Sequence, residues 1–238
     1  MASDEFFAAP RRGRWVAIVA GVVVVVAAAV FAVWQLGGSS PDEPDAADPS
    51  SPAGTAPATP TALTVISGSS QEDGVSVGYP HSLIGAVSAS VEYMSQLAST
   101  LDETRAADIG EVVADPLWDN AADEFAHGVA SLREQVGVPA DGAVPDGVSV
   151  TVAPVAYQLR NQTPDKMTVL LLAYTTTQRP DREPQSGIGV YPLMVRWVDA
   201  DWRWVRPDGT IAALDIEGLR QTPGSPEADA LGWLPLTR

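Results

Sequence analysis

Residues 15–36 form the feature that most constrains this chain, an apolar run reading WVAIVAGVVVVVAAAVFAVWQL that contains no charged residue. As a helix that rises ~1.5 Å per residue, the run spans roughly 33 Å, whereas the hydrocarbon core of a bilayer is about 30 Å thick. Trp15 and Trp34 lie near its two ends, where indole rings favour the membrane interface. The sequence therefore predicts a single N-terminal transmembrane helix.

The charges on either side of the run indicate its orientation. Arg11, Arg12 and Arg14 precede it, and acidic residues follow it from Asp42 onward. Because positively charged flanks stay in the cytoplasm, we expect residues 1–14 to be a short cytoplasmic tail. The expected localisation is the cell membrane, single-pass, with the C-terminal domain extracytoplasmic.

A cleavable signal peptide is the alternative interpretation of the same run. Ala27–Ala29 offers small residues at the spacing that a signal peptidase needs. Beyond Ala29, however, the run continues to Leu36 without a polar break, which is longer than the usual apolar region of a signal peptide. This continuation favours the transmembrane helix.

Residues 37–75 predict a disordered linker that is acidic and rich in Pro, Ala and Ser. Almost no large apolar side chain precedes Leu63, so this stretch cannot bury enough surface to fold. Leu63, Val65 and Ile66 fit either the start of the domain or a short edge strand. A flexible chain of this length reaches roughly 30 Å, which holds the domain at residues 76–238 away from the membrane.

The domain opens with helical periodicity. Apolar residues recur at steps of three and four over residues 83–101, 103–113 and 115–136. Ser82 and Asp102 are the expected N-caps of the first two helices. In the third, Pro116 fits the first turn, and Gly137 ends the helix.

The period then changes to two, which predicts strands. They are expected at Val148–Arg160, Met167–Gln178, Ile188–Val198 and Trp202–Val205, with a polar excursion over residues 179–186 and a tight turn over residues 199–201. Pro154 indicates a bulge or an edge position. Ile211–Leu219 fits one more short element, and Trp233–Leu236 is expected to dock back onto the domain. Helices followed by antiparallel strands predict an α+β fold, a curved antiparallel sheet with helices on one face.

The charge balance excludes one class of partner. Beyond Leu36 the chain carries 11 basic and 28 acidic residues. Such a surface repels phosphates, so we expect no direct nucleic acid binding by the large domain. Cysteine is absent, which excludes a lipid-modified cysteine anchor.

Residues that could carry chemistry do not form a recognisable site. His81 and His127 have no partner at metal-ligand spacing, and no nucleophile elbow or phosphate-binding loop occurs. Tyr93, Tyr157 and Tyr174 fit the rim of the core, with their hydroxyls hydrogen-bonded, better than they fit catalytic acids. The predicted strands carry no acid that would face a pocket. We therefore predict no catalytic, cofactor-binding or metal-binding residues, no cofactor, and no enzyme activity.

Four segments resemble a known family. They are GYPHSLIGAVSASVEY at residues 78–93, VAPVAYQLR at 152–160, VRWVDADWRW at 195–204 and GWLPL at 232–236. These segments look like the bitopic membrane proteins of actinobacterial integrative conjugative elements. Those proteins are similar to the inner-membrane scaffold subunit of type IV secretion systems, whose extracytoplasmic domain has a nuclear-transport-factor-two-like fold.

The resemblance implies a non-catalytic scaffold or accessory component of a conjugative DNA-transfer apparatus. Its implied partners are the membrane, other membrane or channel proteins, and further copies of itself in a homo-oligomer. Two alternatives stay open: an accessory subunit of an actinobacterial lipid importer, and a domain that binds a small ligand in the cone between helices and sheet.

Overall fold

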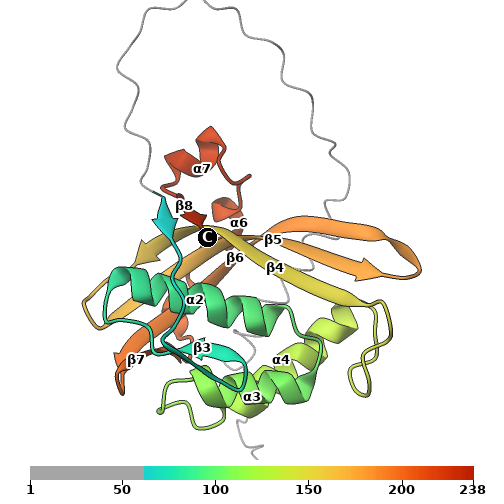
Figure 1. The fold of residues 1–238 in the computed structure, drawn as a ribbon. Coiled ribbons are helices and arrows are strands. Elements are labelled where there is room, and N and C mark those ends of the chain that lie inside the picture. Colours follow the sequence, from blue (N-terminus) through green and yellow to red (C-terminus); the bar gives the residue numbers. More distant parts are fainter. Residues whose placement is uncertain (1–61) are drawn as a thin grey trace, which may run out of the picture.

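The computed structural model describes residues 62–238 as an α+β domain, in which three helices cover one face of a curved sheet (Figure 1). The helices are α2 (Leu83–Ala98), α3 (Glu103–Val113) and α4 (Ala121–Gln135). The strands of the six-stranded sheet are β1 (Leu63–Thr64), β8 (Leu234–Thr237), β4 (Ser149–Arg160), β5 (Lys166–Arg179), β6 (Arg182–Val198) and β7 (Asp201–Val205), in that spatial order. All neighbours pair antiparallel except β1 and β8, which are parallel.

The first two helices begin where their capping residues predict. Ser82 Oγ accepts a hydrogen bond from Gly85 N at 3.1 Å, and Asp102 Oδ1 accepts from Thr104 N and Arg105 N. These bonds satisfy N–H groups that have no partner within the helix. The bounds of α3 match the prediction, and α2 ends at Ala98, three residues earlier than predicted.

The start of the third helix was predicted wrongly. Residues 115–120 are not helical, and α4 begins only at Ala121. Asp115 instead donates its N–H to Trp204 O at 2.8 Å, next to a bridge between Ala114 and Trp204. Leu117, an apolar residue within the predicted helix at residues 115–136, is 80% exposed. Contacts with a strand far along the chain thus override the local signal of Pro116.

The apolar run in β5 lies in the interior of the domain. Val169–Ala173 in β5 is buried on both faces, by α2–α4 on one side and by the C-terminal segment on the other. In β4 the register with β5 shifts between Pro154 and Ala156, which confirms an irregularity at Pro154.

The polar excursion predicted at residues 179–186 is strand. β5 continues to Arg179 and β6 begins at Arg182, so that only Pro180 and Asp181 form the turn of a long hairpin. The alternation of apolar and polar residues that predicts a strand is absent here, because both faces of the hairpin end carry polar side chains. Arg179 Nη1 anchors this end by donating to Val136 O at 2.7 Å.

Aromatic side chains fill the space between the helices and the sheet. The predicted turn is confirmed at Asp199 and Ala200, which have φ values of 53° and 61°. It places Trp197 opposite Trp202, with ring centroids 5.5 Å apart. Trp202 is fully buried, and Tyr93 Oη donates to its carbonyl at 2.8 Å. The cone interior is thus packed with rings.

The folded domain starts before residue 76. β1 pairs through its two residues with β8, and β2 (Ser70–Glu72) pairs with β3 (Val75–Val77). Leu63 and Val75 are buried. The sequence signal is weak here because Ser and Gly separate the few apolar residues. The remaining linker positions, 37–61, lie outside the described residues.

The C-terminal segment docks back onto the domain, as predicted, and the structure places it on the outer face of the sheet. It contains the short helices α5 (Gly209–Ala212), α6 (Ile216–Leu219) and α7 (Pro226–Ala230), followed by β8. Figure 1 shows α6 and α7 on the side of the sheet opposite α2–α4. Trp233 is 2% exposed and packs with Leu170, Leu172 and Val190.

No helix within residues 62–238 is long and apolar enough to cross a membrane. The predicted transmembrane helix at residues 15–36 and the cytoplasmic tail at residues 1–14 lie outside the described residues.

An ion pair with a buried carboxylate fixes the non-helical segment before α4. Asp115, whose side chain is 3% exposed, accepts from Arg196 Nε at 2.7 Å and Arg196 Nη2 at 2.8 Å. Burial on its own raises the pKa of Asp115, but the hydrogen bonds from Arg196 and Leu117 N outweigh it and lower the pKa below the usual carboxyl value.

This lowered pKa predicts a loss of stability in acid. Because the folded pKa lies below the unfolded one, the contribution is full above pH ~4 and is lost as pH falls through the folded pKa. Asp115→Asn should lower the free energy of unfolding by about 1–2 kcal/mol, since Arg196 remains partly solvated. It should also weaken the loss of stability at low pH, as measured by unfolding followed through tryptophan fluorescence. Asp181→Asn is the control, because the Asp181 side chain, which pairs with Arg179, is 54% exposed. An unaltered acid limb in Asp115→Asn would contradict the assignment.

Candidate functional site

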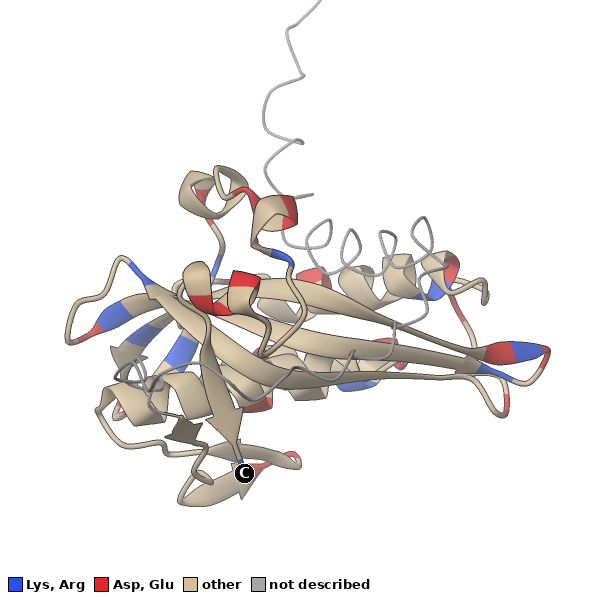
Figure 2. Ribbon diagram, turned by 90° about the horizontal axis from the view of Figure 1, so that it is seen from above, with Lys and Arg blue, Asp and Glu red and all other residues tan. Residues whose placement is uncertain are grey.

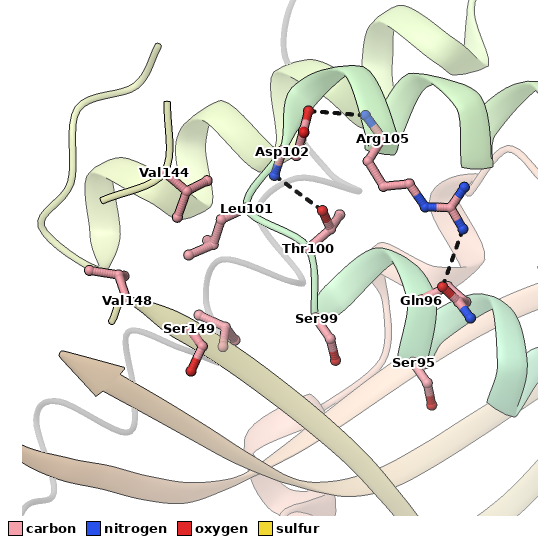
Figure 3. Close-up of a pocket in the computed structure, with 11 residues that line it drawn as sticks. Ser95, Gln96, Ser99, Thr100, Leu101, Asp102, Arg105, Val144, Val148 and Ser149 are labelled. Atoms are coloured by element: carbon pink, nitrogen blue, oxygen red, sulfur yellow. Dashed lines mark hydrogen bonds between the residues drawn. The ribbon is translucent and has the colours of Figure 1, made fainter. Parts of the chain in front are cut away.

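Two neighbouring hollows lie along α2. The first, called the α2 groove, has a volume of about 540 Å³ and is formed by the end of α2, the loop into α3 and the start of β4 (Figure 3). Leu101, Val144, Val148 and Val150 supply apolar side chains, and Ser, Thr, Gln, Asp and Arg side chains supply polar ones. These residues are far apart in the sequence and meet only through the packing of α2 on β4.

Hydrogen bonds hold the polar rim of the α2 groove. Arg105 reaches across from α3, donating from Nη2 to Gln96 Oε1 at 3.3 Å and from Nη1 to Asp73 O. Figure 3 shows Arg105 and Gln96 side by side at one end of the groove. Ser99 Oγ accepts from Val152 N at 2.9 Å and so fixes the end of α2 to the sheet. The rim is thus built from side chains with fixed partners.

The second hollow continues along the same helix. It has a volume of about 500 Å³, shares Ser95 and Gln96 with the α2 groove, and is bounded on its far side by the segment after β1. Glu92, a residue of α2, links this helix to β3. Its Oε1 accepts hydrogen bonds from Ser76 N at 3.2 Å and from Gln96 Nε2 at 3.1 Å. Ser95 Oγ is buried without a hydrogen-bond partner in the structure.

One wall of the α2 groove depends on a buried arginine. Arg133, on α4, is 1% exposed and donates to three carbonyl oxygens. These are Pro139 O at 2.7 Å, Leu101 O at 3.0 Å and Asp141 O at 2.8 Å. Arg133 thereby ties the loop after α4 to the loop before α3.

The lining groups suit recognition. The α2 groove contains no histidine, and its carboxylate, Asp102, accepts from backbone N–H groups at the start of α3. The groove offers apolar contact and hydrogen bonds to a ligand.

The two histidines lie on different elements. His81 precedes α2, stacks on Trp197 with centroids 4.4 Å apart and pairs with Asp165 at 2.8 Å. His127 is an exposed residue of α4. No group of three or more His, Asp or Glu side chains that could hold a metal ion occurs within residues 62–238.

The tyrosines divide into two kinds. Tyr93 and Tyr157 are buried inside the core, whereas Tyr174 is 43% exposed on the long hairpin. Burial, the largest cause, raises the pKa of Tyr93 well above the ordinary tyrosine value, so it is a neutral hydrogen-bond donor. No sequence motif indicated Ser95, Gln96 or Arg133, because hydroxyl, amide and guanidinium groups on helices are common surface residues.

Comparison with known proteins gives one match. A family model described as "Domain of unknown function (DUF8175)" matches residues 37–223. The chain belongs to this family. The matched DUF8175 range contains the α2 groove, Arg133 and strands β4–β7, and ends before α7 and β8. No curated protein and no solved structure matches the chain.

Proposed function

We propose that this DUF8175 protein is a membrane-anchored, non-catalytic scaffold or accessory component of a conjugative DNA-transfer apparatus of the type IV secretion kind. In this proposal its domain is nuclear-transport-factor-two-like and binds other channel proteins outside the cytoplasmic membrane. Helices packed on one face of a curved antiparallel sheet are compatible with that fold.

The order of the segments carries the proposal. An apolar run that fits one bilayer span is followed by a stretch with six prolines before β1. A flexible chain of that length reaches roughly 25–30 Å, so the run would hold the domain near the membrane without pressing it onto the lipid. This arrangement suits a protein that presents a binding surface at a fixed reach.

The interior of the domain supports a binding role over small-molecule chemistry. Tyr93, Trp202 and Trp204 fill the region between helices and sheet. The buried acids are occupied: Asp115 pairs with Arg196, and Asp201 accepts from the N–H groups of Gly78 and Tyr79. The open hollows along α2 are left as sites for a partner.

Deletion of the gene from a mobile element, followed by mating, tests this function. Transfer should fall by several orders of magnitude and return with a wild-type copy, because a missing scaffold stops assembly. Complementing copies carrying Ser40→Cys or Ala2→Cys report the topology, since the native chain has no cysteine. Only Cys at position 40 should react with an impermeant maleimide in whole cells. Unchanged transfer would contradict the proposal, and labelling at position 2 alone would show that the topology is the opposite one.

A further inference from the structure

Basic residues gather at one end of the sheet. Lys166, Arg196 and Arg203 occupy directly opposed positions on β5, β6 and β7. Figure 2 shows Lys and Arg positions on neighbouring strands at this end. With Arg206 just after β7, they make four of the 11 basic residues beyond Leu36, where 28 acids occur. Like charges directly opposite one another destabilise a sheet, so this arrangement costs stability.

Local contacts neutralise only some of these cations. Arg196 is paired with Asp115, and Arg206 with Glu124. Arg203 donates to Val112 O at the end of α3. Asp199 and Asp208 interact with Arg196 and Lys166 at longer range.

Lys166 and Arg206 are the exposed members of the group. Within residues 62–238 Arg206 pairs with Glu124, whereas the ammonium of Lys166 has no ion pair. Lys166 therefore keeps its charge available to a ligand.

Three of the cations line one hollow, called the cationic pocket. Lys166, Arg196 and Arg206 bound a volume of about 200 Å³ together with Asp115, and Trp118 and Val205 supply apolar wall. Leu117, also part of the lining, projects into solvent.

Donors remain available in the cationic pocket. Arg196 uses Nε and Nη2 on Asp115, which leaves Nη1, and Arg206 uses Nη2 on Glu124. Lys166 adds three N–H donors. Charge-assisted bonds from such groups to a carboxylate are about twice as strong as neutral ones. A carboxylate in the pocket can therefore accept hydrogen bonds from these cationic side chains next to an apolar surface.

We propose that the cationic pocket binds a carboxylate side chain in an acidic peptide segment of a partner protein, with an aliphatic residue of that segment against Leu117. The inference rests on the proposed binding role, but not on which apparatus the partner belongs to. A bilayer is bound through inserted apolar area, and one projecting leucine offers little of it. This favours a protein segment over lipid.

Lys166 permits a selective test because it is the only lysine in the chain. Reductive ¹³C-methylation of the full chain in a neutral detergent labels only Lys166 and the N-terminal amine, and it preserves charge. The probe is the peptide acetyl-Asp-Glu-Leu-Asp-Glu-amide. The Lys166 methyl resonance should shift on titration while the N-terminal one stays fixed. The matched peptide acetyl-Asn-Gln-Leu-Asn-Gln-amide should shift neither.

Variants separate the pocket from general charge. In anisotropy titrations of the fluorescein-labelled acidic peptide, Lys166→Gln should weaken binding about tenfold, which corresponds to one charge-assisted bond. Arg238→Gln removes the same charge outside the pocket and should change affinity less than twofold. Leu117→Ser should weaken binding several-fold.

Four results would overturn the inference. They are no shift of the Lys166 resonance, equal weakening by Lys166→Gln and Arg238→Gln, displacement of the peptide by equimolar inorganic phosphate, and tighter binding to phosphatidylglycerol vesicles than to peptide. None of these four results changes the outcome expected of the mating experiment. If peptide binding fails while deletion still abolishes transfer, the pocket is wrong and the proposed function stands.

Discussion

Arg133→Leu is expected to lower the free energy of unfolding by about 3 kcal/mol. Leucine fits the buried position but leaves the carbonyls of Leu101, Pro139 and Asp141 without their donor. Each buried carbonyl without a partner costs ~1–3 kcal/mol, and removing the desolvated cation returns part of that. For a domain of this size the melting temperature should fall by roughly 6–12 °C.

Arg133→Lys is the matched control for this prediction. It keeps the charge but replaces a planar fork of donors by a point charge, so an intermediate loss is expected. Hydrogen exchange should show faster opening of residues 137–147 in Arg133→Leu than in Arg133→Lys. Equal melting temperatures for wild type and Arg133→Leu would mean that the guanidinium does not hold this loop.

Trp233→Ala is expected to lower the free energy of unfolding by about 3–5 kcal/mol, the range measured when a buried Trp is truncated. The indole packs on Leu170 and Leu172, and its Nε1 donates to Leu219 O at 3.0 Å. Its removal leaves a cavity on the outer face of the sheet and frees the segment that leads into β8. Denaturant unfolding followed by circular dichroism measures this loss.

Leu231→Ala tests whether position in the C-terminal segment alone explains that effect. Leu231 lies two residues before Trp233 but is 39% exposed. Its truncation should therefore cost less than about 1 kcal/mol. Similar losses in both variants would show that Trp233 contributes no more than its exposed neighbour.

Local signals in the sequence predicted the elements that are stabilised locally. Asp102 caps α3 with its own side chain, and Pro154 marks the irregularity in β4, because both effects act within a few residues. The docking of Trp233 was predicted because a large apolar side chain near the end of a chain needs cover.

Features that depend on distant partners escaped prediction. The segment at Asp115 is held by Arg196 and Trp204, which are about 80 to 90 residues further along the chain. A local sequence pattern cannot predict a contact over that separation. The long hairpin past Gln178 is polar on both faces, which hides its period of two.

The candidate sites escaped prediction for the same reason. Helix periodicity does not distinguish a buried Arg133 from a surface arginine. The cationic pocket joins Lys166, Arg196 and Arg206 only after three strands have paired in register.

The pairing of β1 with β8 sets the order in which the domain can be completed. β8 lies between β1 and β4, so Leu63 meets its neighbour Leu236 only after almost the whole chain has been synthesised. During synthesis from the N-terminus, helices α2–α4 and strands β4–β7 are made first, and the segment nearest the linker has to wait. A chain stopped before β8 therefore leaves its first strand unpaired and the adjacent edge of β4 open.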